Sequence, residues 1–343
     1  MNQNGKIKIV NKRLYSILEI STTHKGEIAH MKIEKIAVLG TGTMGPSMAI
    51  LSAQAGFDVI MYGRSDESLE RGFNNIKDSL NRLKLGGQIA EGKCEEILGK
   101  VRGVKTIEDA AKEADFVLEC LAEELKLKQD VFEKLDKVCP SEVILATITS
   151  GLSPTEISKN MTHPERIVVA QVWNPAHLVP LIEVIPGERT SKETMDRTIE
   201  WVESIGKKPV AMKKECAGFI GNRLQFALLR EALYIVEQGW ATAEEVDKAM
   251  EYGLGRRLPA TGPLISADLG GLDVFSHISE YLFKDLCNST ELPKLLKSKV
   301  EAGKLGVKTG EGFYKWTPDF LEKKQRERQE VLTYLLEKDS EEK

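Results

Sequence analysis

The chain of 343 residues carries 48 basic and 52 acidic side chains, so its formal net charge is −4. No basic excess is present to neutralise phosphates, which argues against nucleic acid as the main partner. Apolar residues form 41% of the chain, and at ~150 residues per domain the length predicts about two globular domains. No apolar run approaches the ~18 residues of a membrane helix, and five scattered cysteines without a CxxC pair argue against a disulfide framework and against a metal site.

The first 33 residues differ from the rest of the chain in being polar and basic. They contain two short strand-like apolar runs, 7–10 and 14–20, but not the continuous apolar core of a secretory signal. We therefore expect residues 1–33 to be an extension without a catalytic role. Together with the cysteine pattern, this favours a cytoplasmic protein with no membrane partner.

Short apolar runs alternate with helical stretches from residue 34 to about 213. This alternation predicts a parallel sheet with helices on both faces. Helical spacing then begins at Asn222, continues to about 251, and is followed by further helices to about 302. The sequence thus predicts an α/β domain (34–213), an all-α domain (214–316) and a charged tail (317–343) that is an exposed helix or frayed. The predicted strands are 36–39, 59–62, 116–120, 143–147, 167–170 and 181–185, and the predicted early helices are 46–55 and 68–85.

A glycine-rich loop follows the first predicted strand and opens the first predicted helix. It reads Gly40-Thr41-Gly42-Thr43-Met44-Gly45, the GxGxxG pattern of dinucleotide-binding proteins. Gly40 permits the tight turn, Gly42 leaves space for a pyrophosphate, and Gly45 allows the helix to pack closely. The free N–H groups at the helix start, which include Thr43 and Met44, suit phosphate oxygens.

The end of the second predicted strand indicates which dinucleotide binds. An NAD site usually has an acidic residue there, but this chain has Gly63, followed by Arg64 and Ser65. Arg64 can pair with a 2′-phosphate, and Ser65 can donate a hydrogen bond to it. We expect NADP(H) as the cofactor. NAD(H) is the alternative, with Asp66 or Glu67 reaching back to the ribose.

Seven segments together resemble the 3-hydroxyacyl-CoA dehydrogenase family, including its branch acting on small acids (L-gulonate dehydrogenase, λ-crystallin and carnitine dehydrogenase). The resemblance covers about residues 34–316. It implies a Rossmann-type α/β domain followed by an all-α dimerisation domain, hence a homodimer, with the active site in the cleft between the domains. The segments are KIAVLGTGTMG (35–45), EELKLKQDVF (123–132), TSGLSPTEI (149–157), NPAHLVPLIEVI (174–185), AGFIGNRLQ (217–225), GLGRRLPATGPL (253–264) and LGVKTGEGFYKW (305–316).

The resemblance also implies roles for matching residues. Glu123 and Lys128 lie in the segment that approaches the nicotinamide ribose. Ser150 matches a serine that bonds the substrate oxygen, and Asn222 matches an asparagine that completes the substrate site. Asn174 precedes Pro175 in the active-site Asn-Pro turn.

One catalytic position departs from the family pattern. The family has a histidine three residues before the asparagine of Asn-Pro, oriented by a carboxylate that matches Glu183, but this chain has Gln171 there. Glutamine forms hydrogen bonds but does not titrate, and losing a general acid–base typically slows a reaction ~10²–10⁴-fold.

Three interpretations of Gln171 remain open. Ketone reduction proceeds through a water relay or a neighbouring acid, with His177 as the candidate, although an exposed loop histidine is the simpler interpretation. Alternatively, the enzyme reduces C=N bonds, where the hydride step itself needs no acid. In the third, the position is a natural or engineered knock-out, and the chain binds its ligands without turnover.

The substrate end is indicated by two further residues. Arg257 matches an arginine of the small-acid branch and can hold a carboxylate through two hydrogen bonds, although a solvated helix-end arginine is the competing interpretation. Trp173 would narrow the pocket, or simply belong to the core. The sequence therefore predicts hydride transfer between NADP(H) and the 3-oxo/3-hydroxy carbon of a small carboxylic acid or acyl thioester. An imine reductase or amine dehydrogenase, and an inactive crystallin-like protein, are the alternatives.

Overall fold

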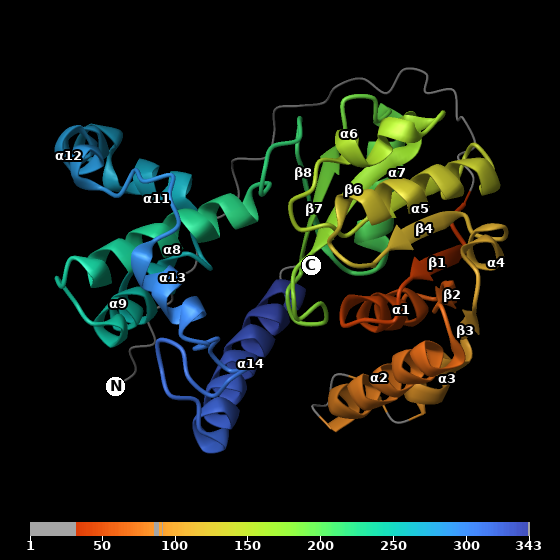
Figure 1. Ribbon diagram of the computed structural model, residues 1–343, viewed down its shortest axis with the longest axis horizontal. Helices are drawn as coiled ribbons and strands as arrows, with labels where there is room; N and C mark the ends of the chain where they lie inside the picture. The colour runs from red at the N-terminus through yellow and green to blue at the C-terminus, as the bar shows by residue number, and fades with distance from the viewer. Residues whose placement is uncertain (1–31, 86–88, 91, 342–343) are drawn as a thin grey trace, which may run out of the picture. The chain divides into compact units, whose positions relative to one another are not determined.

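The protein was analysed as a computed structural model, which describes residues 32–85, 89–90 and 92–341. The strand-like runs 7–10 and 14–20, and the remainder of the expected extension up to residue 31, lie outside the described residues. From residue 33 onward the chain forms one unit, in which a sheet flanked by helices is followed by helices (Figure 1). This is the predicted fold class.

Within the described residues, eight strands form a single sheet in the order β3-β2-β1-β4-β5-β6-β7-β8. All neighbouring pairs are parallel except β6 and β7, which are antiparallel. The expectation of a wholly parallel sheet was therefore wrong at this pair. Two strands, β3 and β8, were not predicted, because a Val-Arg-Gly-Val run and a run containing Pro209 carry no clear apolar signal. The strands are β1 (Lys35–Leu39), β2 (Asp58–Tyr62), β3 (Val101–Val104), β4 (Phe116–Glu119), β5 (Ile144–Thr147), β6 (Ile167–Val172), β7 (Leu181–Pro186) and β8 (Lys208–Ala211).

Helices cover both faces of the sheet because successive strand residues point to opposite sides. Ile36 and Val38 of β1 pack in the cluster formed with α1, α2, α3 and α7, whereas Ala37 and Leu39 pack in the cluster with α4, α5 and α6. On the first face Trp201 of α7 stacks on Phe116, with ring centroids 4.4 Å apart. The helices of this part are α1 (Met44–Gln54), α2 (Asp66–Leu85), α3 (Lys93–Gly99), α4 (Ile107–Ala111), α5 (Leu125–Val138), α6 (Pro154–Ile157) and α7 (Lys192–Ser204), with the 3-10 helices η1 (Ser158–Asn160) and η2 (Pro164–Arg166).

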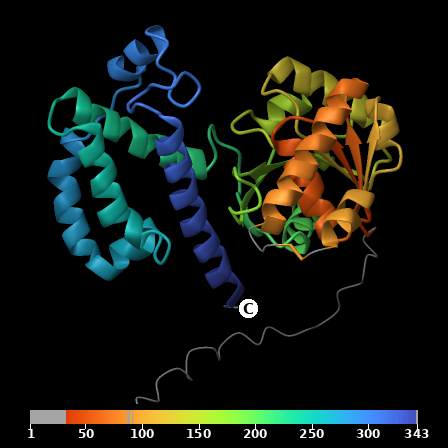
Figure 2. The same ribbon diagram turned by 90° about the horizontal axis from the view of Figure 1, so that it is seen from below.

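The elements after β8 are helical (Figure 2). The helix predicted from 222 to about 251 is divided in two, because Gly239 has φ +71° and Thr242 caps the next helix by accepting from the Glu245 amide. The charged tail forms a helix, α14. The helical elements are α8 (Gly221–Glu237), α9 (Ala243–Ala249), the π-helix η3 (Met250–Leu254), α10 (Gly255–Arg257), α11 (Pro263–Gly270), α12 (Leu272–Asp285), α13 (Lys294–Glu301) and α14 (Pro318–Glu341).

A buried lysine holds the loop between β6 and β7. The ammonium of Lys207, which lies just before β8, donates to the carbonyls of Ala176 and Val179. Burial lowers the pKa of Lys207 from 10.5 to about 8. The unfolded chain therefore binds a proton between these two pH values that the folded chain does not bind, so this group adds stability as the pH rises through that range.

The Lys207→Met variant tests this burial. We expect the free energy of unfolding of the wild type, relative to the variant, to rise by up to about 3 kcal/mol between about pH 8 and about pH 10.5. Urea unfolding of both proteins at several pH values measures it. A wild-type-minus-variant difference that stays constant across this range would contradict the lowered pKa.

Candidate active site

The glycine loop is tightly packed on the sheet side. Gly40 has φ +128°, and a Cβ built there would lie 2.7 Å from the carbonyl oxygen of Cys120. A Cβ on Gly45 would lie 2.0 Å from the carbonyl oxygen of Gly40. Only glycine fits at these two positions, because neither backbone neighbour is a side chain that can move away.

The other side of the loop is open. A Cβ on Gly42 would meet nothing within 4 Å. Helix α1 begins at Met44, Thr43 makes no side-chain cap, and the first turn contains no acidic residue. The first N–H groups of α1 are thus not capped by these side chains, and these features fit the pyrophosphate of a dinucleotide.

At the end of β2, a side chain at position 63 would have to displace neighbouring side chains. A Cβ on Gly63 would lie 2.7 Å from the Ser68 hydroxyl and 2.9 Å from Leu69 Cδ2. The Ser65 hydroxyl accepts a hydrogen bond from the Ser68 amide, as a cap of α2. Its hydrogen bond to Glu67 is the main cause that lowers the pKa of that carboxyl. Ser65 therefore already has partners where the sequence suggested a phosphate contact.

The charged residues beside this turn differ in their pairing. Asp66 is paired with Lys105, at 3.2 Å. Arg64 is exposed and makes no ion pair with any described residue. Its guanidinium is therefore available to a ligand at the end of β2. Lys105, which follows β3, was not singled out from the sequence, because β3 itself carried no signal.

A buried ion pair lies where β4 and β5 end. The Lys128 ammonium donates to both oxygens of Glu119, at 2.8 and 2.7 Å, and both side chains are buried. The Thr147 hydroxyl donates to the same carboxylate at 2.6 Å. Lys128 is also 3.6 Å from the Glu123 carboxylate. Sequence reasoning missed Glu119, although a glutamate ending the otherwise apolar strand Phe116–Glu119 is a signal of a buried polar role.

Four of the predicted site residues are joined by a chain of contacts at the same edge of the sheet. Glu123 accepts hydrogen bonds from the Thr149 hydroxyl at 2.5 Å and from the Ser150 amide at 2.8 Å. The Asn222 side-chain amide of α8 donates to the Ser150 carbonyl at 2.9 Å. With Lys128 beside Glu123, the structure brings together Glu123, Lys128, Ser150 and Asn222, which are widely separated in the sequence.

Glu183 on β7 joins the sheet to the first helix after it. Its side chain is 1% exposed, and one carboxylate oxygen accepts from the Ile220 and Gly221 amides at 2.8 and 3.0 Å. The other oxygen accepts from the indole N–H of Trp173 at 3.3 Å. A Cβ on Gly221 would lie 2.3 Å from the Trp173 ring, so glycine is required where this ring meets the start of α8.

Gln171 lies directly opposite Glu183 in the β6–β7 register. It is 5% exposed, and its side-chain oxygen is buried without a hydrogen-bond partner among the described residues. Because the described hydrogen bonds of the Glu183 carboxylate come from Trp173 and the start of α8, this carboxylate does not orient Gln171 by a direct bond. A buried acceptor without a donor is unfavourable by about 1–3 kcal/mol, so this position suits a ligand that donates.

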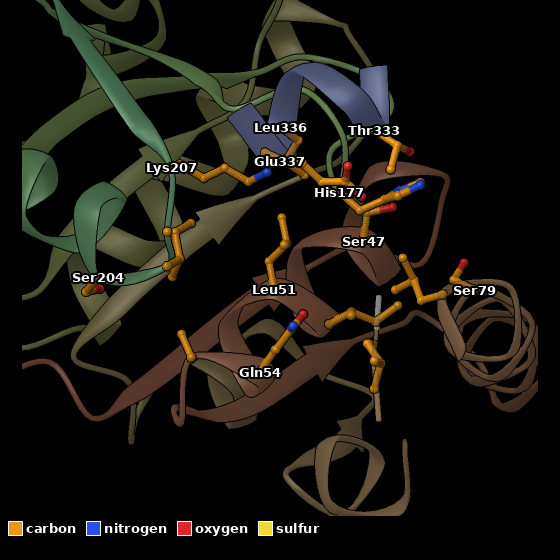
Figure 3. A pocket seen from close by; sticks show the side chains of 16 residues that line it. Ser47, Leu51, Gln54, Ser79, His177, Ser204, Lys207, Thr333, Leu336 and Glu337 are labelled. Atoms are coloured by element: carbon orange, nitrogen blue, oxygen red, sulfur yellow. The ribbon is translucent and has the colours of Figure 1, made fainter. Parts of the chain in front are cut away.

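His177 and Arg257 lie apart from this group. His177 lines a cavity of about 630 Å³ with Ser47 of α1 and with Thr333 and Glu337 of α14 (Figure 3). Burial, with smaller contributions from Lys207 and Arg82, lowers its pKa. Arg257 is exposed on α10, and no described hydrogen bond or ion pair joins its side chain to the residues above. Asn174 is exposed beside Trp173.

In the part of the chain that the structure describes, no group of three or more His, Cys, Asp or Glu side chains is placed to hold a metal ion. Among the same residues, no helix combines the length and the apolar character needed to cross a bilayer.

Comparison with known proteins places the chain in a family. Residues 35–216 match the family model described as 3-hydroxyacyl-CoA dehydrogenase, NAD binding domain, and residues 218–316 match that of the C-terminal domain. The chain is 36% identical over 300 residues to 5-formyl-3-hydroxy-2-methylpyridine 4-carboxylate 5-dehydrogenase of Mesorhizobium japonicum, covering 88% of this chain and 96% of the relative. It is 37% identical over 239 residues to L-carnitine dehydrogenase of Oceanobacillus iheyensis, covering 70% of this chain and 76% of the relative.

A solved structure supports the same assignment. The crystal structure of a 5-formyl-3-hydroxy-2-methylpyridine 4-carboxylic acid 5-dehydrogenase, described as an NAD+ dependent dismutase, superimposes with a TM-score of 0.79 at 34% identity. The alignment covers 89% of this chain and 97% of that one. The sheet with its glycine loop, the helical domain after it and the two family matches together show that this chain belongs to the 3-hydroxyacyl-CoA dehydrogenase family and is an NAD(P)-dependent oxidoreductase of that type.

Proposed function

We propose that the protein transfers hydride between NADP(H) and the 3-oxo/3-hydroxy carbon of a small carboxylic acid or acyl thioester. The observation that carries this proposal is the buried Gln171 amide, whose oxygen has no donor in the described structure. It lies opposite Glu183, on the strand that leads to Trp173 and Asn174. The relative with carnitine as its named substrate supports a small acid.

The residues of the site would bind and orient the two ligands. The loop of Gly40, Gly42 and Gly45 would hold the pyrophosphate, and the bound nicotinamide supplies or accepts the hydride. Gln171 can accept from the hydroxyl of an alcohol substrate or, through its NH₂ group, donate to the oxygen of a ketone. With Ser150 and Asn222 it would stabilise charge on the reacting oxygen by fixed hydrogen bonds.

The proton of the reaction would come from water. Glutamine does not titrate, and the described contacts of Glu183 are all with donors, so that this carboxylate serves as an acceptor. His177 lines a cavity whose lining includes neither Gln171 nor Glu183, which weighs against it as the acid. Catalysis would then depend on placed donors and would be slower than in a site with a histidine at position 171.

The end of β2 supports NADP(H) over NAD(H). Gly63 is packed against Ser68 and Leu69, which disfavours an acidic side chain there, and Arg64 is exposed and unpaired among the described residues. A guanidinium suits a 2′-phosphate. The relative described as NAD+ dependent makes NAD(H) the alternative.

A second candidate function is the reduction of C=N bonds. An unpartnered acceptor on Gln171 beside the carboxylate of Glu183 suits a protonated imine, which carries a positive charge and an N–H donor. The hydride step on such a substrate needs no acid.

A homodimer is the assembly that we propose, with the all-α domain from about residue 214 as its interface. Among the described residues of α9 to α13 none is buried, and α8 buries only Leu233. Large apolar side chains are instead exposed, among them Leu264, Leu269, Tyr281 and Phe283. A second copy that covers them would supply the missing core.

The cysteines of the described residues are free, which supports the proposed cytoplasmic location.

Gln171→His tests the chemistry. We expect the wild type to reduce 3-oxo acids with NADPH in the absence of amine, and the variant to be faster by roughly 10²-fold, because imidazole supplies the proton that glutamine cannot. NADPH oxidation with a panel of 3-oxo acids, with and without a small amine, measures both proteins. Gln171→Leu, which lacks donor and acceptor, is the matched control and should be slower than the wild type.

The other outcomes distinguish the candidates. Turnover by the wild type only in the presence of amine, abolished by histidine, identifies C=N reduction. Tight NADPH binding without turnover on any substrate identifies an inactive protein.

Arg64→Gln tests the cofactor choice. We expect kcat/KM for NADPH to fall roughly 10- to 100-fold, the effect of losing a charged hydrogen bond to phosphate, and kcat/KM for NADH to change little. Arg102→Gln, an exposed arginine of β3 paired with Glu113, is the charge-matched control. Equal losses for both cofactors in Arg64→Gln would contradict a role in recognising the 2′-phosphate.

Leu269→Glu tests the dimer. We expect the wild type to have the mass of two chains in light scattering, and the variant to shift toward one chain, because a carboxylate would be buried in the interface. Leu85→Glu on α2 introduces the same charge at another exposed leucine and should leave the mass unchanged. A wild type with the mass of one chain refutes the proposal.

A further inference from the structure

We infer that Arg328, on the C-terminal helix α14, is a positioning residue of the active site that holds the Asn-Pro turn. The inference rests on the proposed function, since it assigns Arg328 a part in that reaction. Helix α14 (Pro318–Glu341) begins after residue 316, where the match to the family's C-terminal domain ends. Nothing in the two matched domains therefore assigns this helix a role.

The contact is made to the backbone of the turn. One guanidinium nitrogen of Arg328 donates to the carbonyl oxygen of Asn174 at 3.4 Å, across 154 positions of sequence. Asn174 directly follows Trp173, whose indole donates to Glu183. The position of Asn174 thus affects the ring that anchors Glu183 opposite Gln171.

The rest of the loop is held by Lys207, which lines the same cavity as the later turns of α14 (Figure 3). Lys207 donates to the carbonyls of Ala176 and Val179, and the Pro175 carbonyl accepts from the amides of Leu178 and Val179. The carbonyl of Asn174, three residues after Gln171, receives its donor from α14. Lys207 and Arg328 therefore fix the two ends of one loop.

A second part of α14 faces the same loop across a cavity. Thr333, Leu336 and Glu337, one to three helical turns after Arg328, line the cavity that His177 enters from the loop (Figure 3). Loop residues Ala176 and Leu178 are buried, so the backbone between the two contact regions is packed in place. One part of α14 thus bonds to Asn174, and another part shares a cavity with His177 of the same loop.

Arg328→Ala, with Arg328→Lys as the conservative variant, tests the inference. We expect kcat for a 3-oxo acid to fall roughly 3- to 10-fold in Arg328→Ala, with KM and the melting temperature little changed, because one hydrogen bond that orients the turn is lost. Lysine retains a donor and should restore part of kcat. Arg326→Ala is the matched control, since Arg326 lies on the same helix and faces Glu330 at 4.0 Å.

Hydrogen exchange supplies a measurement that does not need turnover. The Leu178 and Val179 amides should exchange roughly 3- to 10-fold faster in Arg328→Ala than in the wild type or in Arg326→Ala. Unchanged exchange overturns the inference whether or not the protein is active. Faster exchange with unchanged kcat also overturns it, since the contact would then be structural alone.

Failure of the proposed function gives a different pattern. A wild type that turns over no substrate refutes the function, and binding then replaces turnover as the measurement. NADPH and a 3-oxo acid added together should slow exchange of these amides in the wild type and slow it less in Arg328→Ala. Equal slowing in both proteins overturns the positioning role.

Discussion

The buried carboxylate of Glu183 is the interaction on which the site depends. It lies on β7, and it accepts two backbone N–H groups at the start of α8 and the indole N–H of Trp173. A carboxylate is unfavourable inside a protein unless donors replace its water, and hydrogen bonds to a charged group contribute about 1.5–3 kcal/mol each. These three donors therefore fix the sheet, the tryptophan and the first helix of the second domain against one another. Gly221 makes the arrangement possible, since a Cβ there would overlap the ring.

This arrangement limits the hydrogen bonds that the Gln171 side chain can form. With Glu183 engaged by Trp173 and α8, position 171 retains burial and a free acceptor but has no direct carboxylate partner. Under the proposed function, an amide in such a place would bind and orient the substrate without exchanging protons, so rate enhancement would come from the placement of donors and of the hydride carrier. The loop between β6 and β7 then matters more, and long-range contacts from Lys207 and Arg328 hold it.

Much of the α/β architecture was predictable because its signals are local. The β-branched strands, the glycine loop and the helix that follows it depend on residues within a few positions of one another, and the observed β1, α1 and β2 correspond to the predicted runs. The reversal between β6 and β7 was not predictable in this way, because apolar runs carry no strand direction. Strand β8 was not predictable either, because Pro209 argues against a strand, and among the described strands β8 pairs with β7 alone.

The sequence alone determined the fold class and the family, because motifs and residue identities are properties of contiguous segments. Only the tertiary structure decided which side chains form hydrogen bonds and ion pairs with one another. Lys128 pairs with Glu119, Ser65 caps α2, and Trp173 becomes the partner of Glu183. His177, six residues from Gln171, points into another cavity. Such partnerships follow from side-chain direction and from contacts over long sequence distances, which spacing along the chain does not encode.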